Sequence, residues 1–210
     1  LHRARTQLRR ELAPLAPVPF AASKKEVPMV EVKVEDVLVR VTANDPSKIV
    51  LETPAIILLK EKSGERSMPI FVGLPEGANL AAPLADHKFP RPTTADLTIE
   101  LLRATGGTIE RIAITSIRDN TFYAHISANG DEVDARPSDA INLAVRATAP
   151  ILLEESLLDE YGLGERTLVQ KIEHVAAKIG LELPAGTWKS LSLELLLAQE
   201  VMRWTSRPER

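Results

Sequence analysis

Alternation of valine with charged residues near the start of the chain most constrains what this sequence can fold into. Val30, Val32 and Val34 alternate with charged residues, as in a β-strand that buries one face. The alternation shifts by one residue at Asp36 and then continues to Val41. A shift of one residue is typical of a β-bulge. The region therefore predicts a long, half-buried strand and, with it, a sheet.

Strand and helix signals alternate along the rest of the chain. Strands are expected at 49–61, 68–72, 108–117, 121–127, 132–135 and 151–153, and helices at 75–85, 93–105, from 137 onward, 165–179 and 188–204. Gly77 and Pro83 weaken the first helix. A Thr-x-x-Asp capping box starts the second, in which Leu97 and Leu101 lie one turn apart. This order predicts an α+β fold, with a mixed or antiparallel sheet packed with helices and a helical pair at the C-terminal end.

Composition limits the classes of protein that the chain can belong to. Aromatic residues make up only 4% of 210 residues, so the core must consist of aliphatic side chains. The net charge of −3 gives no whole-chain sign of nucleic-acid binding. The lack of cysteine excludes disulfides and thiolate metal sites and fits a cytoplasmic location. No apolar run approaches the roughly 20 residues that a membrane span needs.

Four segments differ in charge and in proline content. Residues 1–12 resemble the end of a basic helix, because they hold four arginines against one glutamate. Residues 13–28 contain four prolines and are expected to form a linker. We expect one folded domain at 29–160 and a helical extension at 161–210.

Residues 134–139, with the sequence Asp-Ala-Arg-Pro-Ser-Asp, are the most informative short run. They predict a strand-to-helix turn in which Arg136 lies between two carboxylates, because proline favours the first position of a helix. A similar start, Arg-Pro-Thr, occurs at 91–93. The repetition has two readings, an old duplication or two uses of one helix-start signal, and the second is slightly favoured.

Nuclease activity is implied by a family resemblance that rests on four motifs of the chain, and the residues themselves are consistent with it without requiring it. Phosphodiester cleavage needs a nucleophilic water, neutralisation of the phosphate charge and a proton for the leaving oxygen. Carboxylates that hold Mg²⁺ or Mn²⁺ commonly supply these functions, with arginine at the phosphate. If the two helix starts converge, they form a polar cleft with Asp134 and Asp139 as metal ligands. The candidate site residues are Asp134, Asp139, Arg136, Arg91, Asp96 and Glu76, with His87 and His125 as candidate general acids or bases.

A structural role explains the same residues. Carboxylates in the first turn of a helix stabilise it by ~0.3–1 kcal/mol. Asp96 and Asp139 occupy such positions, and Arg91 and Arg136 could pair with them and hold the two turns together. His87 and His125 then become ordinary solvated residues.

Four motifs in order resemble the bifunctional nuclease (BFN) domain family. They are Pro69-Ile-Phe-Val-Gly73 with Glu76, Arg91-Pro-Thr93 with Asp96-Leu97, Phe122-Tyr-Ala124, and Asp134-Ala-Arg-Pro-Ser-Asp-Ala-Ile141. The resemblance covers roughly 130 residues. It implies an α+β fold, self-association into a homodimer or higher homo-oligomer, and nuclease activity on DNA and RNA.

The chain departs from the family pattern at two places. Ala95 stands where the family often has a histidine, and the helix after Gly73 begins Pro-Glu-Gly instead of Glu-Ala. Both changes weaken the case for catalysis.

The first twelve residues are similar to the last helix of extracytoplasmic-function sigma factors. This likeness implies a BFN domain fused behind a sigma factor, with RNA polymerase as a partner. A generic basic helix is the other reading.

Two functions are therefore open. The first is a metal-dependent nuclease that uses the turn at 134–139. The second is a non-catalytic module for ligand sensing or oligomerisation that regulates transcription.

Overall fold

The computed structural model describes residues 27–41, 54–162, 167–183 and 187–193. Its elements, in chain order, are β1 (Met29–Val41), β2 (Ala55–Glu61), β3 (Ser67–Val72), α2 (Leu74–Leu84), α3 (Thr94–Ala104), β4 (Ile109–Arg118), β5 (Thr121–Ala128), β6 (Asp131–Ala135), α4 (Pro137–Ala147), β7 (Ile151–Glu154), α5 (Glu155–Tyr161), α6 (Leu168–Lys178) and β8 (Thr187–Ser190). The basic segment at 1–12 and residues 13–26 of the linker expected at 13–28 lie outside the described residues.

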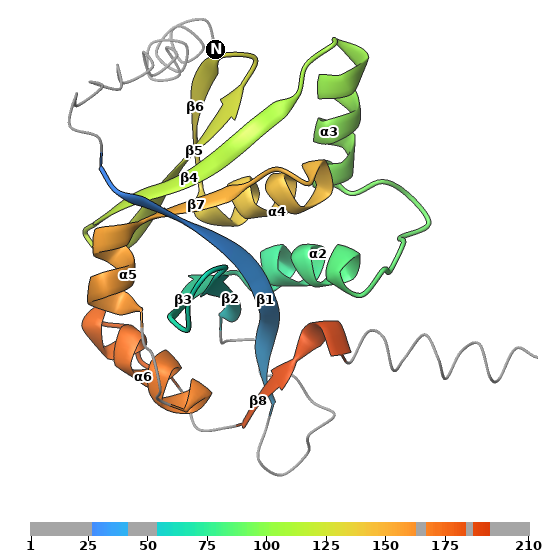
Figure 1. The fold of residues 1–210 in the computed structure, drawn as a ribbon. Coiled ribbons are helices and arrows are strands. Elements are labelled where there is room, and N and C mark those ends of the chain that lie inside the picture. The colour runs from blue at the N-terminus through green and yellow to red at the C-terminus, as the bar shows by residue number, and fades with distance from the viewer. Residues whose placement is uncertain (1–26, 42–53, 163–166, 184–186, 194–210) are drawn as a thin grey trace, which may run out of the picture.

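Eight strands form one mixed sheet in the order β3-β2-β1-β7-β4-β5-β6, with β8 also paired to β1 (Figure 1). Within this sheet every pairing is antiparallel except that of β4 with β7. The predicted α+β fold with a mixed sheet is therefore confirmed.

The long strand β1 contains the predicted bulge. Its register against β2 shifts between Val34 and Asp36. The Asp36 carboxylate accepts hydrogen bonds from the Val37 N–H at 2.8 Å and from the Ser190 hydroxyl at 2.8 Å. The second bond reaches β8, so the residue at which the pattern shifts also holds the last described strand of the sheet.

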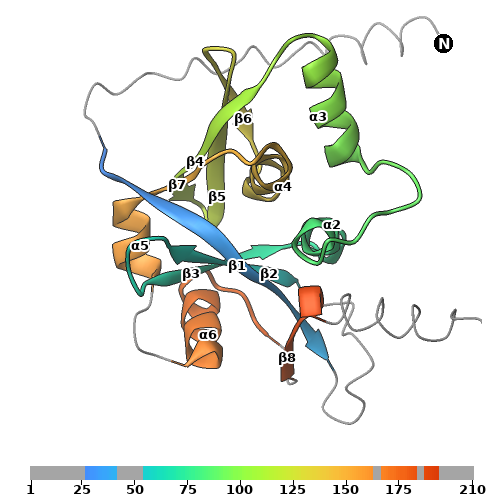
Figure 2. The ribbon, with the colours of Figure 1, turned by 45° about the vertical axis from the view of Figure 1, so that its right-hand side comes forward.

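Helices α2 and α4 lie side by side against the sheet, with α3 packed on α4 (Figures 1 and 2). Helix α2 packs on β1 and β2, and α4 packs on β4 and β5. Gly77 allows the first contact, because a Cβ at this position would lie 2.5 Å from the Cβ of Ala55. The glycine that weakens the helix in sequence is thus required by its packing, and Pro83 is accommodated near the end of α2.

The core is aliphatic, as the composition predicts. Fully buried side chains include Ile57, Ile112, Ile114, Ile141 and Leu153. Burial of such side chains is the dominant force that drives folding.

Helix α3 exposes the leucines that its sequence pattern placed together. Leu97 is 52% exposed and Leu101 is 60% exposed, whereas Ala95 and Ile99 form the buried face. The helix itself and its capping box are confirmed.

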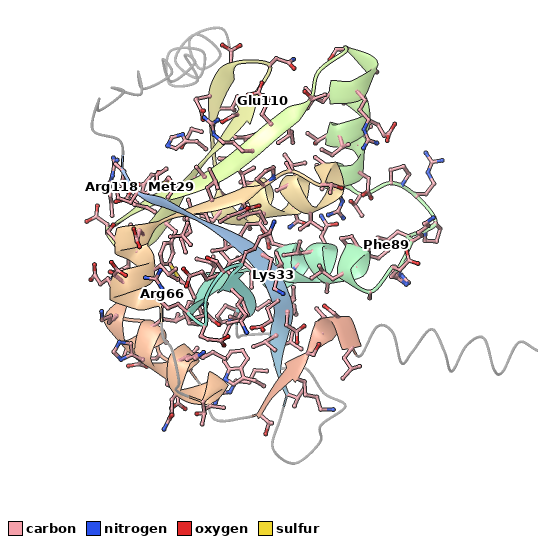
Figure 3. The ribbon with its side chains drawn as sticks, in the orientation of Figure 1. Met29, Lys33, Arg66, Phe89, Glu110 and Arg118 are labelled. Atoms are coloured by element: carbon pink, nitrogen blue, oxygen red, sulfur yellow. The ribbon has the colours of Figure 1, made fainter. Side chains whose placement is uncertain are left out.

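The C-terminal part differs from expectation. Helix α5 was not predicted, and Arg66 beside it pairs with Asp159 and Glu155 of that helix (Figure 3). Helix α6 agrees with the helix expected at 165–179. The helix expected from 188 is wrong at its start, because residues 187–190 pair with β1 as strand β8.

Candidate functional site

Arg136 lies between two carboxylates at the junction of β6 and α4. It is the N-cap residue of α4, and Pro137 occupies the first turn. Its guanidinium donates two hydrogen bonds to Asp139, at 2.7 and 3.1 Å, and a longer one of 3.4 Å to Glu76 at the start of α2. The bond to Asp139 raises the pKa of Arg136, with a smaller contribution from Glu76, so the guanidinium remains a cation. The side chain is 67% exposed and is therefore open to a ligand.

A cavity of about 650 Å³ opens beside this cluster. Glu76, Arg136 and Ser138 line its polar end. Its remaining walls come from the end of β3, the starts of α2 and α4, the start of β5 with the turn before it, the residue before β2 and the segment after α6. These residues are Ile70, Phe71, Val72, Gly73, Leu74, Pro137, Thr121, Phe122, Asn120, Pro54, Ile179, Gly180 and Leu181. The volume is within the range of pockets that hold small organic ligands, roughly 300–1,000 Å³.

The two helices that begin at this cavity lack side-chain caps. Helix α2 follows Gly73 and α4 follows Arg136, and neither N-cap accepts a hydrogen bond through a side chain. By contrast, Thr93 and Thr167 form capping boxes at the starts of α3 and α6. The first N–H groups of a helix have no partner within the helix. Pro75 and Pro137 carry no N–H, and the Asp139 N–H is bonded to the backbone oxygen of Arg136. This leaves the N–H groups of Leu74, Glu76 and Ser138 for an anion.

A second arginine cluster joins α2, α3 and α4. Arg146, which is only 8% exposed, donates to Asp96 at 2.6 Å, to the Asn79 side chain at 2.8 Å and to the Asn142 side chain at 3.0 Å. Asn142 also donates to the backbone oxygen of Glu76 at 3.2 Å. Burial raises the pKa of Asp96, but hydrogen bonds from Arg146 and Thr93 outweigh this effect and leave the pKa below 3.8. The cluster fixes the helix that carries Glu76.

The remaining predicted residues lie elsewhere. Asp134 is on β6 directly opposite His125 on β5, and it lines neither this cavity nor a second one of about 550 Å³ between α2 and α3. Arg91, Asp96 and His87 line that second cavity. The His87 ring packs edge-on against Phe89, with centroids 5.1 Å apart. Phe89 lies in the loop between α2 and α3 (Figure 3).

The two helix starts at 91–93 and 136–138 therefore build different environments. Asp96 pairs with Arg146 and caps α3 through Thr93, and Arg91 makes no ion pair within the described residues. Proline also differs in place, since Pro137 is inside α4 whereas Pro92 precedes the cap of α3. The similar sequences Arg-Pro-Thr and Arg-Pro-Ser thus start their helices in two different ways, with a threonine cap at α3 and without a side-chain cap at α4.

The arrangement does not fit a preformed divalent-cation site. The guanidinium of Arg136 already occupies the carboxylates of Glu76 and Asp139, which a divalent cation would need as ligands. Asp134 makes no ion pair with another described residue and lines neither cavity. No three acidic or histidine side chains among the described residues are placed to hold a metal. Asp134 and Asp139 as ligands for Mg²⁺ or Mn²⁺ therefore stay a prediction.

Sequence reasoning missed Arg146, Asn79, Asn142 and Ser138. Asn142 and Arg146 are four residues apart on a helix, which places them on one face. The sequence therefore predicts that Asn142 and Arg146 are neighbours, but it does not predict their partners on α2 and α3, which are distant along the chain.

Known proteins resemble this chain mainly over the part that carries these side-chain clusters. Residues 57–165, just over half of the chain, match the Bifunctional nuclease domain family. An uncharacterized protein of Mycobacterium tuberculosis is 35% identical over 136 residues, which cover 64% of this chain and 77% of the relative.

Plant relatives carry the nuclease name. Bifunctional nuclease 2 of Oryza sativa subsp. japonica is 31% identical over 117 residues, or 52% of this chain and 36% of the relative. Bifunctional nuclease 1 of Arabidopsis thaliana is 29% identical over 117 residues, with the same coverage. No helix in the described residues is long and apolar enough to span a membrane. With its α+β sheet and the family motif at the start of α4, the chain belongs to the bifunctional nuclease domain family.

Proposed function

We propose that the protein is a nuclease that hydrolyses phosphodiester bonds at the cavity beside Arg136. The observation that carries the proposal is the placement of an exposed arginine between Glu76 and Asp139, at a cavity where two uncapped helices begin. The plant relatives named bifunctional nucleases support the reaction class.

Each group has a role in this proposal. Arg136 neutralises the phosphate, and the free N–H groups of α2 and α4 bind its oxygens. The bond from Arg136 to Glu76 is the longest of its three, so a phosphate displaces Glu76 first. The freed Glu76 carboxylate takes a proton from a water whose oxygen attacks phosphorus. The bond from phosphorus to the leaving oxygen breaks, and that oxygen takes a proton from solvent. Asp139 keeps the guanidinium in place.

The direct experiment is cleavage of labelled DNA and RNA by purified protein, with Mg²⁺, with Mn²⁺ and with a chelator. We expect Glu76→Gln to lower kcat by about 100-fold, the usual scale of general-base catalysis. The matched control is Glu100→Gln, which alters an exposed glutamate that pairs with Arg103 on α3. Intact substrates under all three conditions, or equal rates for both variants, would contradict the proposal.

One observation favours the alternative of a non-catalytic module that senses a ligand or assembles. Leu97 and Leu101 are exposed on one face of α3, and two copies of the chain could bury them against each other. In that case the protein is a homodimer or larger, and a sigma factor preceding the domain could bring it to RNA polymerase and to DNA.

Light scattering after size-exclusion chromatography tests this alternative. A dimer that Leu97→Glu converts into a monomer, without cleavage by either form, would support it. A parent chain that is monomeric at roughly tens of micromolar would count against it.

A further inference from the structure

Ser138 is a mostly buried residue at the edge of the cavity, and its hydroxyl is not among the fully buried polar atoms of the described residues. The residue is 7% exposed and lines the cavity. Its hydroxyl makes no hydrogen bond with any described residue, whereas its backbone oxygen accepts one from Asn142. A hydroxyl that has no protein partner and lines a cavity is available to a ligand that carries a hydrogen-bond acceptor.

The surroundings of Ser138 suit an anionic acceptor. The side chain belongs to the first turn of α4, next to Arg136, and α2 starts on the same cavity wall at Leu74. A phosphate here would accept hydrogen bonds from the Ser138 hydroxyl, the Arg136 guanidinium and the Ser138 backbone N–H, since Pro137 has no N–H and that of Asp139 is bonded to Arg136. It would take over the place that Glu76 holds on Arg136.

Apart from Asn120 and Thr121, the other side chains that line the cavity are apolar and include two aromatic rings. Phe71 comes from β3 and Phe122 from β5, while Ile179 and Leu181 close the side formed by the end of α6. The Phe122 ring is fixed by an edge-on contact with Tyr161, with centroids 6.0 Å apart. Flat aromatic bases bind such surfaces without regard to sequence.

We infer that the cavity binds one unpaired nucleotide, with its phosphate at Ser138 and Arg136 and its base between the apolar walls. The inference rests on the proposed function and names its substrate class, which is single-stranded nucleic acid or a frayed end. A base within a duplex is stacked and paired, so it cannot enter a cavity unless it leaves the stack.

Calorimetry with adenosine monophosphate, adenosine and inorganic phosphate tests the site without any cleavage. We expect the monophosphate to bind at least tenfold more tightly than either part alone. Ser138→Ala should weaken its binding by roughly tenfold, because a hydrogen bond to a charged phosphate is lost. Equal affinity for monophosphate and inorganic phosphate, or parent-like binding by Ser138→Ala, would overturn the inference.

A second variant avoids any change in the packing of α4. Thr121 is exposed at the rim of the cavity, and Thr121→Glu places a negative charge there. We expect it to weaken binding of the monophosphate by more than tenfold. Thr108→Glu, at an exposed position before β4, is the matched control and should bind as the parent does. Equal binding by both threonine variants would overturn the inference.

Cleavage of matched substrates separates this inference from the proposed function. We expect a single-stranded oligonucleotide to be cut at least tenfold faster than its blunt duplex. Binding of the monophosphate without cleavage of any substrate would refute the nuclease and keep the nucleotide site. Equal cleavage of both substrates without binding of the monophosphate would keep the nuclease and refute the site.

Discussion

Arg136 is the N-cap residue of α4 and Arg146 is in its last turn, and both contact carboxylates, but they differ in burial. Arg136 is 67% exposed and has an open cavity beside it, whereas Arg146 is 8% exposed and donates to groups on three helices. A buried cation with satisfied partners stabilises an arrangement, and an exposed one can exchange partners for a ligand. The same pair of residue types thus has a structural role at one end of α4 and, in the proposed function, a chemical role at the other.

Loss of Arg146 should produce the largest change in stability. Arg146→Ala leaves Asp96, Asn79 and Asn142 without their shared donor, so we expect a loss of about 2–4 kcal/mol in the free energy of unfolding. Urea denaturation measures it. A loss as small as that of an exposed ion pair, ~0–1 kcal/mol, would remove the distinction between the two clusters.

Helix α2 contributes a residue to each cluster, and its position depends on Gly77. A Cβ at this residue would overlap Ala55, so Gly77→Ala should destabilise the protein by about 1–3 kcal/mol despite the better helix propensity of alanine. Thermal unfolding checks the sign. A stabilised variant would show that α2 can move away from the sheet without cost.

Loss of a side-chain hydroxyl near the start of a helix should lower the stability of the protein at α3, which has a side-chain cap, but not at α4, which has none. Thr93→Ala removes the capping box of α3 and should cost about 1 kcal/mol. Ser138→Ala removes no cap from α4 and should change stability by less than about 0.5 kcal/mol. Similar losses in chemical denaturation would mean that Ser138 serves the helix and not a ligand.

Asp96 should make a small contribution to the loss of folding stability at acid pH. Its pKa is lowered in the folded protein, so its stabilising contribution is present above the unfolded value and is lost as pH falls through the folded pKa, below 3.8. We expect the stability of Asp96→Asn to depend less on pH below about pH 4 than that of the parent. Parallel curves of urea midpoint against pH would contradict this assignment.

Local signals in the sequence predicted most of the fold. The shift at Asp36 and the capping box at Thr93 depend on neighbouring residues, and both are confirmed. Strand β8 was not predictable in this way, because its strand conformation depends on pairing with β1, far away in sequence.

The candidate site was predictable only in part for the same reason. Arg136 and Asp139 are three residues apart, so their pairing could be expected from the sequence. The contact of Arg136 with Glu76 and the partners of Arg146 depend on how α2 and α3 pack against α4. Asp134 was grouped with Asp139 by sequence, but it lies on the strand before the turn and faces His125.

Parallel measurement of cleavage rate and unfolding free energy for Arg136→Ala and Arg146→Lys tests the division of roles most directly. We predict that Arg136→Ala lowers kcat/KM for a single-stranded substrate by at least 100-fold and costs only ~0–1 kcal/mol of stability. Arg146→Lys should lose stability and keep most of the activity of its folded fraction, because it loses forked hydrogen bonds but not charge. Full activity in Arg136→Ala would contradict the account.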